Sequence, residues 1–193
     1  MNITFAKPSY PPTGAYVILA WEETSANRAV EVLNRKTRGT LKRAMASENF
    51  TGKNGTALTL LAPTGLRADR IILIGAGKIK DFNVREAQSA GGQILSKLNS
   101  LGIKQAAVNV DIVNQKALNA ADCGAHIAFG ASLAGYRFGR YKVKKALANR
   151  VVVRKLTIMG GEPSKMRSRY KPLSAVANGG FFTRDLVSEP ANV

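Results

Sequence analysis

Two uninterrupted apolar runs constrain the fold of this chain more than any other feature of its sequence. They are AYVILAW at residues 15–21 and RIILIG at residues 70–75, and neither alternates polar with apolar side chains. A strand that has one face in water alternates in this way, so runs of this kind predict strands that are buried on both faces. Shorter runs predict further strands at residues 3–5, 56–62, 106–110 and 151–159.

Helical patterns separate these strands. The first predicted helix is capped by Ser25 and ended by Gly39, and the second follows Asp81 with apolar residues at three- and four-residue steps. Two more are expected at about 116–138 and 164–189, the last stopping before Pro190. Strands that alternate with helices predict an α/β fold, a three-layer sandwich with a mixed, mostly parallel sheet between helices.

The chain is longer than one such domain requires. A chain of 193 residues holds a sizeable α/β domain and leaves about forty residues to spare. The segment GGEPSKMRSRYKP at residues 160–172 carries Gly and Pro and is polar and basic, so it is the best candidate boundary. We therefore expect a domain at residues 1–160, followed by a linker helix at residues 161–193.

The charge of the chain points to an anionic partner. Its 29 Lys and Arg residues against 12 Asp and Glu residues give a net charge of +17, an excess that favours polyanions or an acidic partner surface. The basic residues are densest between residues 136 and 171, where Glu162 is the one acid and several aromatic residues intervene. Nucleic-acid contact is predicted for Arg137, Arg140, Lys142, Lys144, Lys145, Arg154 and Lys155. A solvated basic face, or one that docks on an acidic neighbouring domain, remains the alternative.

The sequence offers little material for catalysis. His126 is the only histidine, and Cys123 lies three residues before it on a predicted packed helix with no open pocket between the two. The acids are scattered, and only Asp185 and Glu189 have an i, i+4 spacing, which is expected of a helix-end pair with Arg184 as counter-ion. No catalytic residue and no metal ligand is predicted in this chain.

A glycine-containing turn leaves two interpretations open. The stretch IILIGAGKIKDF at residues 71–82 follows a predicted strand and precedes a helix, a context in which backbone N–H groups bind phosphate. It lacks both the phosphate-loop spacing and the three-glycine dinucleotide fingerprint. The stretch is either a tight strand-to-helix turn or a nucleotide site at Gly75, Gly77 and Lys78.

The compartment follows from what the sequence lacks. Cys123 is the only cysteine, so no intramolecular disulfide can form, which favours a reducing compartment. The first residues, MNITFAKPSYPPTG, have no signal-peptide pattern, and the longest apolar run is far shorter than the roughly 20 residues that cross a bilayer. A cytosolic protein with no membrane contact is predicted.

Two segments resemble the leucine aminopeptidase (cytosol aminopeptidase) family. GASLAGYRFGRYK at residues 130–142 is similar to a helix of small residues that ends in a Tyr-x-Phe-x-x-Tyr-Lys run. ANGGFFTRDLVSEPANV at residues 177–193 is similar to the family's junction, an Arg-Asp-Leu triplet followed by an Asn-Glu-Pro-x-Asn run. NFTGKNG at residues 49–55 and GAGK at residues 75–78 are similar to two further family segments. Departures from the commonest family residues occur at Gly139, Thr183 and Ser188, none of which has a chemical role.

The resemblance implies a function for the parent protein rather than for this chain alone. Family members are hexameric two-domain enzymes that remove N-terminal residues, often leucine, from peptides, and some of them bind DNA. Their amino-terminal domain resembles macro domains, and a long helix leads from it to a catalytic domain. That domain holds two divalent metal ions, usually zinc or manganese, in motifs downstream of the junction. The chain is thus expected to be a non-catalytic domain whose partner is its own catalytic domain. A basic nucleic-acid-binding module and a macro-like nucleotide-binding domain are the alternatives.

Overall fold

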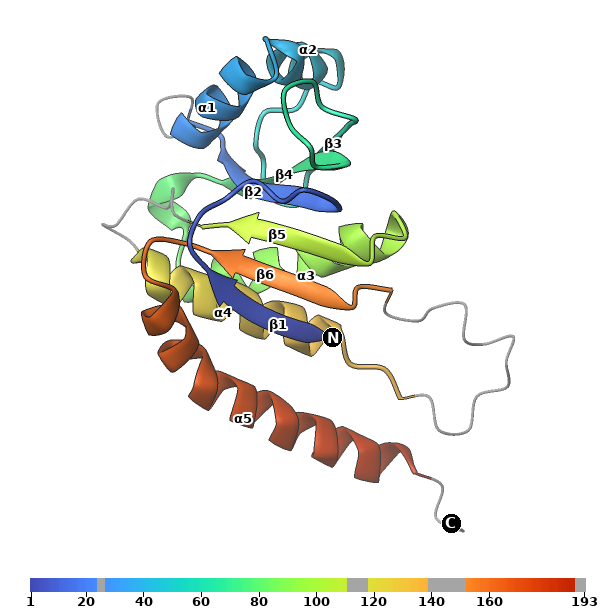
Figure 1. Cartoon of the computed structure of the whole chain (residues 1–193). Coiled ribbons are helices and arrows are strands. Elements are labelled where there is room, and N and C mark those ends of the chain that lie inside the picture. The colour runs from blue at the N-terminus through green and yellow to red at the C-terminus, as the bar shows by residue number, and fades with distance from the viewer. Residues whose placement is uncertain (24–26, 111–117, 139–151, 190–193) are drawn as a thin grey trace.

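The structure of the chain, a computed structural model, describes residues 1–23, 27–110, 118–138 and 152–189 (Figure 1). None of the helices in these ranges combines the length and the apolar character needed to span a membrane. In chain order the elements are β1 (Asn2–Ala6), β2 (Ala15–Trp21), α1 (Arg28–Lys36), α2 (Thr40–Ser47), β3 (Ala57–Leu61), β4 (Arg70–Gly77), a 3₁₀ turn (Ile79–Asp81), α3 (Val84–Ser100), β5 (Gln105–Asn109), α4 (Ala120–Ala134), β6 (Lys155–Met159) and α5 (Pro163–Ser188).

The strands form a single six-stranded sheet in the order β1-β6-β5-β2-β4-β3. Every pair is parallel except β3 with β4, which is antiparallel and forms one edge. The apolar runs at residues 15–21 and 70–75 form β2 and most of β4, which pair along most of their length near the middle of the sheet. Both are buried on both faces, as the absence of polar alternation predicts.

Helices cover both faces of the sheet. Along β2, Val17 and Leu19 face the core beneath α3, α4 and the start of α5, whereas Tyr16 and Ile18 face the core beneath α1 and α2. Figure 1 shows α1 and α2 on one side of the sheet and α3, α4 and α5 on the other. The predicted α/β fold, with a mixed and mostly parallel sheet between helices, is confirmed.

Small residues bring α3 and α4 into close contact. A Cβ atom built on Gly91 of α3 would collide with the backbone carbonyl oxygen of Ile127, and one on Gly130 of α4 would collide with that of Gln88. The backbones therefore approach so closely that only glycine fits at these two crossing points. Among the small residues of α4, Gly130 therefore serves the crossing with α3, whereas Gly124 lies against Met166 of α5 and Ile158 of β6.

The first predicted helix corresponds to α1, and α2 is a further helix that the sequence analysis does not predict. α1 begins after Asn27, and α2 follows at Thr40, because Gly39 adopts a left-handed φ of 82° and redirects the chain into a new helix rather than ending the helical region. Ser25, the predicted cap, lies outside the described residues. Asn27 occupies the N-cap position but makes no side-chain cap hydrogen bond; its side chain accepts from the N–H of Trp21 at 2.8 Å and donates to the carbonyl of Trp21 at 2.7 Å, which ties the start of α1 to the end of β2.

The last strand and the last two helices differ in their bounds from the sequence prediction. β6 begins at Lys155 rather than at 151, because the N–H groups of Val152 and Val153 donate to the side-chain oxygen of Asn99 instead of to a neighbouring strand. α4 ends at Ala134, and α5 runs to Ser188 as one helix with Pro172 inside it. The division of the chain at residue 160 stays a prediction.

Candidate functional site

The two segments that carry the family resemblance meet at the end of α4. Tyr136 lies just beyond α4, and its hydroxyl donates a hydrogen bond of 2.7 Å to Oδ1 of Asp185 on α5. Its ring stacks on Phe181, with ring centroids 5.2 Å apart and an interplanar angle of 20°. The guanidinium carbon of Arg184 lies 4.3 Å from the centre of the same ring. We call these four residues the Tyr136 cluster. It fixes the distal part of α5 against the end of α4.

The hydroxyl of Tyr136 must keep its proton in order to donate this hydrogen bond, and its surroundings favour the protonated form. The pKa of Tyr136 is raised above its usual value, mainly because desolvation disfavours the phenolate and then because the hydrogen bond to Asp185 requires the proton. The negative charge of Asp185 acts in the same direction, whereas the positive charge of Arg184 opposes it. The hydroxyl therefore remains a donor at neutral pH, and the link between the two helices stays closed.

A groove lies beside the Tyr136 cluster. Its volume is about 290 Å³, and it runs between the end of α4 and the middle of α5, with Met1 at one side. Tyr170 lines it, and its hydroxyl lies 2.7 Å from the hydroxyl of Ser132. The described residues of the lining combine aromatic rings with hydroxyl and amide groups, and none of them carries a carboxylate or an imidazole. Its chemistry is that of a packing seam between two helices rather than that of a reaction centre.

The other two segments that resemble the family also lie side by side. The N–H of Gly77 donates to the carbonyl of Gly52 at 2.9 Å, and the N–H of Gly75 donates to the carbonyl of Thr56 at 2.8 Å. A Cβ atom on Gly75 would collide with the carbonyl oxygen of Lys53. Gly52, with a φ of 81°, adopts a backbone conformation that strongly favours glycine. Gly52 and Gly75 are thus explained by the conformation and close packing of this turn, whereas Gly55, with a φ of 84°, has open space where a Cβ atom would lie.

The electrostatics around this turn do not favour phosphate. A depression of about 330 Å³ beside Gly77 and Lys78 is lined by the carboxylates of Glu22, Asp81 and Glu86. Three carboxylates repel a phosphate group, and Lys78 is the one cation among the described residues that line the depression. The nucleotide site expected at Gly75, Gly77 and Lys78 remains an untested prediction, and the geometry supplies a packing reason for the same glycines.

Most of the predicted nucleic-acid contacts lie outside the described residues. These are Arg140, Lys142, Lys144 and Lys145. Arg137, which is described, donates from its guanidinium to the carbonyls of Ala134 and Tyr136, at 3.0 and 2.7 Å, and so serves the end of α4. Arg154 and Lys155 are exposed at the start of β6. Joint contact of these residues with nucleic acid stays a prediction.

Cys123 and His126 both lie on α4, but Cys123 faces the core beneath the sheet and His126 contacts α3. Cys123 is fully buried in the core beneath the sheet, and burial raises the pKa of its thiol well above the usual value, so it remains a protonated packing group. His126 is partly buried, and its Nδ1 lies 3.1 Å from the amide nitrogen of Gln88 on α3. Burial lowers the pKa of His126, and the nearby negative charge of Asp122 opposes that shift. Both residues are accounted for by the packing of α4.

Several carboxylates are already engaged in structural contacts. Asp185 accepts from Tyr136, Glu86 accepts from the amide of Asn54 at 3.0 Å, and Glu31 pairs with Lys42 at 2.8 Å. Over residues 1–23, 27–110, 118–138 and 152–189, no three His, Cys, Asp or Glu side chains are grouped so as to hold a metal ion. The described residues therefore do not fit a metal centre, and the expected absence of metal ligands from the whole chain stays a prediction.

Comparison with known proteins assigns the chain to a family. Residues 17–145 match the family described as "Cytosol aminopeptidase family, N-terminal domain". A probable cytosol aminopeptidase of Caulobacter vibrioides is 33% identical over 181 residues, which cover 94% of this chain and 35% of that protein. One from Nitrobacter winogradskyi is 32% identical and covers 100% of this chain and 38% of that protein. The chain thus spans a little over a third of the length of these curated relatives.

Solved structures share the fold. A mutant of tomato leucine aminopeptidase superposes with a TM-score of 0.77 at 23% identity, covering 99% of this chain and 39% of that one. The bottromycin maturation enzyme BotP in complex with Mn gives a TM-score of 0.67 at 15% identity, covering 93% of this chain and 32% of that one. These identities are low, so the structures support the fold, while the sequence match carries the assignment. The chain belongs to the cytosol aminopeptidase family and corresponds to its N-terminal domain.

Proposed function

We propose that this chain is the non-catalytic amino-terminal domain of a leucyl aminopeptidase that depends on two divalent metal ions. The parent protein would remove amino acids from the N-termini of peptides by means of metal-activated water. In this proposal the chain contributes no reacting group. Its task is to present α5 to a following catalytic domain and to support the assembly of the parent. One observation carries the proposal, the exposed apolar surface on the distal half of α5.

That surface is unusual for a helix in water. Val176, Phe182, Leu186 and Val187 are 64%, 65%, 56% and 82% exposed, and we call these four residues the distal α5 face. Figure 1 shows this half of α5 extending beyond the sheet toward the C-terminus. Gathered apolar side chains of this size are rarely left in water and mark contact surfaces. The distal α5 face is therefore suited to dock against another folded unit.

The backbone of the same turns also allows close contact. Gly179 and Gly180 have open space where a Cβ atom would lie, and no other part of the described chain covers them. The Tyr136 cluster holds this half of α5 from its other side through Phe181 and Asp185. A helix that is fixed on one side and bare on the other presents a prearranged surface to a partner.

We infer that the partner is the catalytic domain of the same protein. The matched relatives are nearly three times as long as the matching region, and the matched family domain is N-terminal. Their remaining length is sufficient for a second domain of larger size. In this proposal the metal pair, zinc or manganese, is held in that second domain, since the described carboxylates of this chain do not fit a metal centre. The manganese bound by BotP supports manganese as one choice.

The wider properties of the parent follow from the family. We propose that the full protein forms hexamers with this domain toward the outside, and that it acts in the cytosol. The name given to the relatives, cytosol aminopeptidase, supports that location. Hexamer formation rests on the family resemblance alone.

A chimera tests the docking role of the distal α5 face. This chain would replace the matching segment of the Caulobacter vibrioides relative, and leucine-amide hydrolysis would be measured with added Mn²⁺. We expect the chimera to be active, and Phe182→Asp with Leu186→Asp to lower kcat/KM at least tenfold, because burying unpaired carboxylates costs several kcal/mol. Leu61→Asp is the matched control, since Leu61 is 62% exposed on the edge strand β3. Equal activity of the two variants would overturn the docking role.

A further inference from the structure

We propose that Asn54 is a site of spontaneous deamidation, at which its side-chain amide becomes a carboxylate while the protein is folded. Asn54 precedes Gly55, and the pair forms the exposed turn that leads into β3. In this reaction the backbone nitrogen of the following residue attacks the side-chain carbonyl carbon, and glycine hinders that nitrogen least because it has no Cβ atom. An Asn-Gly pair therefore reacts readily wherever the fold allows the attack.

The reaction consumes only water. The backbone N–H of Gly55 loses its proton, its nitrogen forms a bond to Cγ of Asn54, and the side-chain nitrogen leaves as ammonia. Water then opens the resulting cyclic imide at one of its two carbonyl groups, which gives either aspartate or isoaspartate at position 54. In isoaspartate the main chain runs through the side-chain carbon atoms, so the backbone is one atom longer. No bond is oxidised or reduced.

The structure separates this pair from the second Asn-Gly pair of the chain. Gly55 has a left-handed φ of 84° and open space where a Cβ atom would lie, and none of the described residues accepts a hydrogen bond from its N–H. Asn178 and Gly179 are also exposed, but they lie inside α5. There the carbonyl four residues earlier holds each N–H, and the helix fixes the backbone torsions. We therefore expect deamidation at Asn54 and protection of Asn178.

Little restrains the side chain of Asn54. Its Oδ1 accepts a hydrogen bond from Nε2 of Gln93 at 3.1 Å, and its Nδ2 donates one to Oε2 of Glu86 at 3.0 Å. Both bonds are exposed, so water replaces either partner at a small cost in free energy. While it is in place, the donor from Gln93 stabilises the negative charge that develops on Oδ1 during the attack. The surroundings of Asn54 therefore do not block the reaction.

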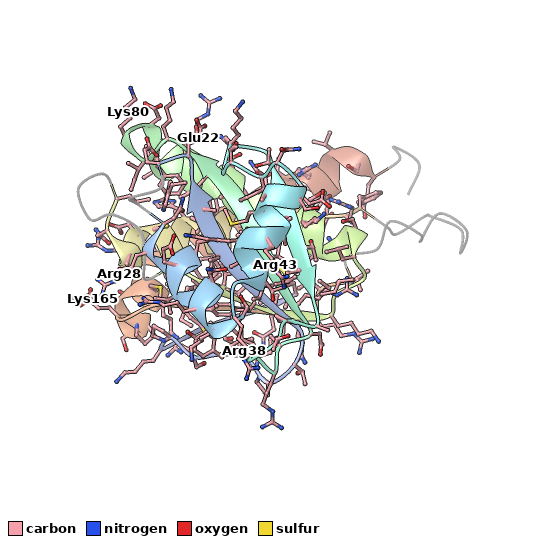
Figure 2. All side chains as sticks on the ribbon, turned by 90° about the horizontal axis from the view of Figure 1, so that it is seen from above. Glu22, Arg28, Arg38, Arg43, Lys80 and Lys165 are labelled. Carbon is pink, nitrogen blue, oxygen red and sulfur yellow. The ribbon has the colours of Figure 1, made fainter. Side chains whose placement is uncertain are left out.

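The product changes the charge balance around the turn. Asn54 lines a depression of about 330 Å³ together with the carboxylates of Glu22, Asp81 and Glu86. Figure 2 shows Glu22 and Lys80 at the same edge of the molecule. A carboxylate at position 54 would replace the hydrogen-bond donor to Glu86 by a second negative charge, and like charges at that separation repel each other. Deamidation should therefore weaken the contact between the turn and α3.

Isoaspartate would also disturb the backbone pairing at the start of β3. The N–H of Thr56 donates to the carbonyl of Lys53 at 3.1 Å and so closes the turn, and the carbonyl of Thr56 accepts from the N–H of Gly75 at 2.8 Å. An additional main-chain atom between Lys53 and Thr56 changes the geometry of both hydrogen bonds. Either product is thus expected to lower the stability of the chain.

This inference does not depend on the proposed function. The turn at residues 54–55 shares no residue with the Tyr136 cluster or with the distal α5 face. An unreactive Asn54 would therefore leave the aminopeptidase proposal intact, and an inactive chimera would say nothing about Asn54.

Mass spectrometry of proteolytic fragments tests the inference. The whole chain is incubated at 37 °C and at pH values between 7 and 9, and it is then digested at low pH, where the reaction is slow. In the folded chain Asn54 should react at least about tenfold faster than Asn178, because α5 must first open locally, and its rate should rise with pH. In urea the two rates should agree within about twofold, since unfolding removes the protection by the helix. Equal rates in the folded chain, or no reaction at Asn54 while the unfolded chain reacts, would overturn the inference.

Variants at two positions test the site and its consequence. Asn54→Gln should abolish the reaction in that fragment, because the longer side chain does not form the five-membered ring readily. An isoaspartyl-specific methyltransferase should label the incubated unmodified chain but not this variant, and equal labelling of both would count against Asn54. Asn54→Asp should lower the melting temperature by about 2–4 °C. Adding Glu86→Gln should restore at least half of that loss, because the amide then donates to the new carboxylate. A melting temperature unchanged in Asn54→Asp would refute the proposed consequence.

Discussion

Tyr136 links the two helices that matter most for the proposed function. It contacts α5 through a hydrogen bond, a stacked ring and a cation, and all three partners lie within the five residues from Phe181 to Asp185. Of these contacts, the hydrogen bond from the hydroxyl to Asp185 is the one that depends directly on the proton of Tyr136. The orientation of distal α5 relative to α4 is therefore sensitive to alkaline pH.

We expect the stability that comes from this hydrogen bond to be lost in alkali. The folded-state pKa of Tyr136 is raised above the unfolded value of about 10, so the contribution is complete below that value and disappears as pH rises through the folded pKa. Between pH 8 and 11, the melting temperature of the unmodified chain should decrease more steeply with pH than that of Tyr136→Phe. Tyrosinate absorbance should show that Asp185→Asn moves the titration of Tyr136 to lower pH. An unchanged titration in Asp185→Asn would contradict the assigned contact.

The sequence identifies both partners of this contact but not their pairing. Tyr136 and Asp185 both belong to segments that resemble the family, yet they are 49 positions apart. No periodicity connects two residues on different elements, because their proximity depends on how α4 and α5 cross. The pairing of Asn99 with Val152 and Val153 is equally invisible in the sequence, although the side chain of Asn99 accepts hydrogen bonds from both of their N–H groups. Such tertiary contacts are set by packing, which the local sequence does not encode.

At the scale of elements, the crossing of α3 and α4 sets the tightest steric limit. Gly91 and Gly92 are neighbours on α3, but a Cβ atom on Gly91 would collide with the carbonyl of Ile127, whereas one on Gly92 would make an ordinary 3.8 Å contact with Ala134. Gly91→Ala should lower the free energy of unfolding by about 1–3 kcal/mol, because neither backbone can move aside.

The adjacent position supplies the control for this prediction. Gly92→Ala should raise the free energy of unfolding by up to about 1 kcal/mol, since alanine favours the helix and meets no obstacle. Urea denaturation of both variants at pH 7 measures the two values. Equal stability of the two variants would contradict the close approach of α3 and α4.

The elements differ in how well their sequences predict them. β2 and β4 are predicted well because burial on both faces requires continuous apolar residues, and α3 because its apolar positions recur at the helical period. α2 is missed because Gly39 resembles a helix end, although its left-handed conformation here starts a second helix. β6 is predicted too long because β-branched residues at 151–153 favour a strand. In the structure the N–H groups of Val152 and Val153 donate hydrogen bonds to the side chain of Asn99 instead of to a neighbouring strand.

At the scale of the whole molecule, exposed cations lie on both sides of the sheet. Arg28, Arg35 and Arg43 are exposed on α1 and α2, whereas α5 carries both the distal α5 face and the exposed cations Lys165, Arg167, Arg169 and Lys171. The net charge of +17 predicts an anionic partner from sequence, but only the structure places Arg28, Arg35, Arg38 and Arg43 on one surface. The exposed face of α5 escapes sequence analysis, because a pattern of apolar residues does not show which of them are left uncovered.

The central claim is that the groups that hold the metal ions of the aminopeptidase belong to another part of the parent protein. The most direct test measures leucine-amide hydrolysis by this chain alone, rigorously purified, with added Mn²⁺ and with the full-length gene product as the positive control. We predict turnover by the full-length product and none above the buffer background by this chain. Hydrolysis by the isolated chain that a metal chelator abolishes would contradict the account.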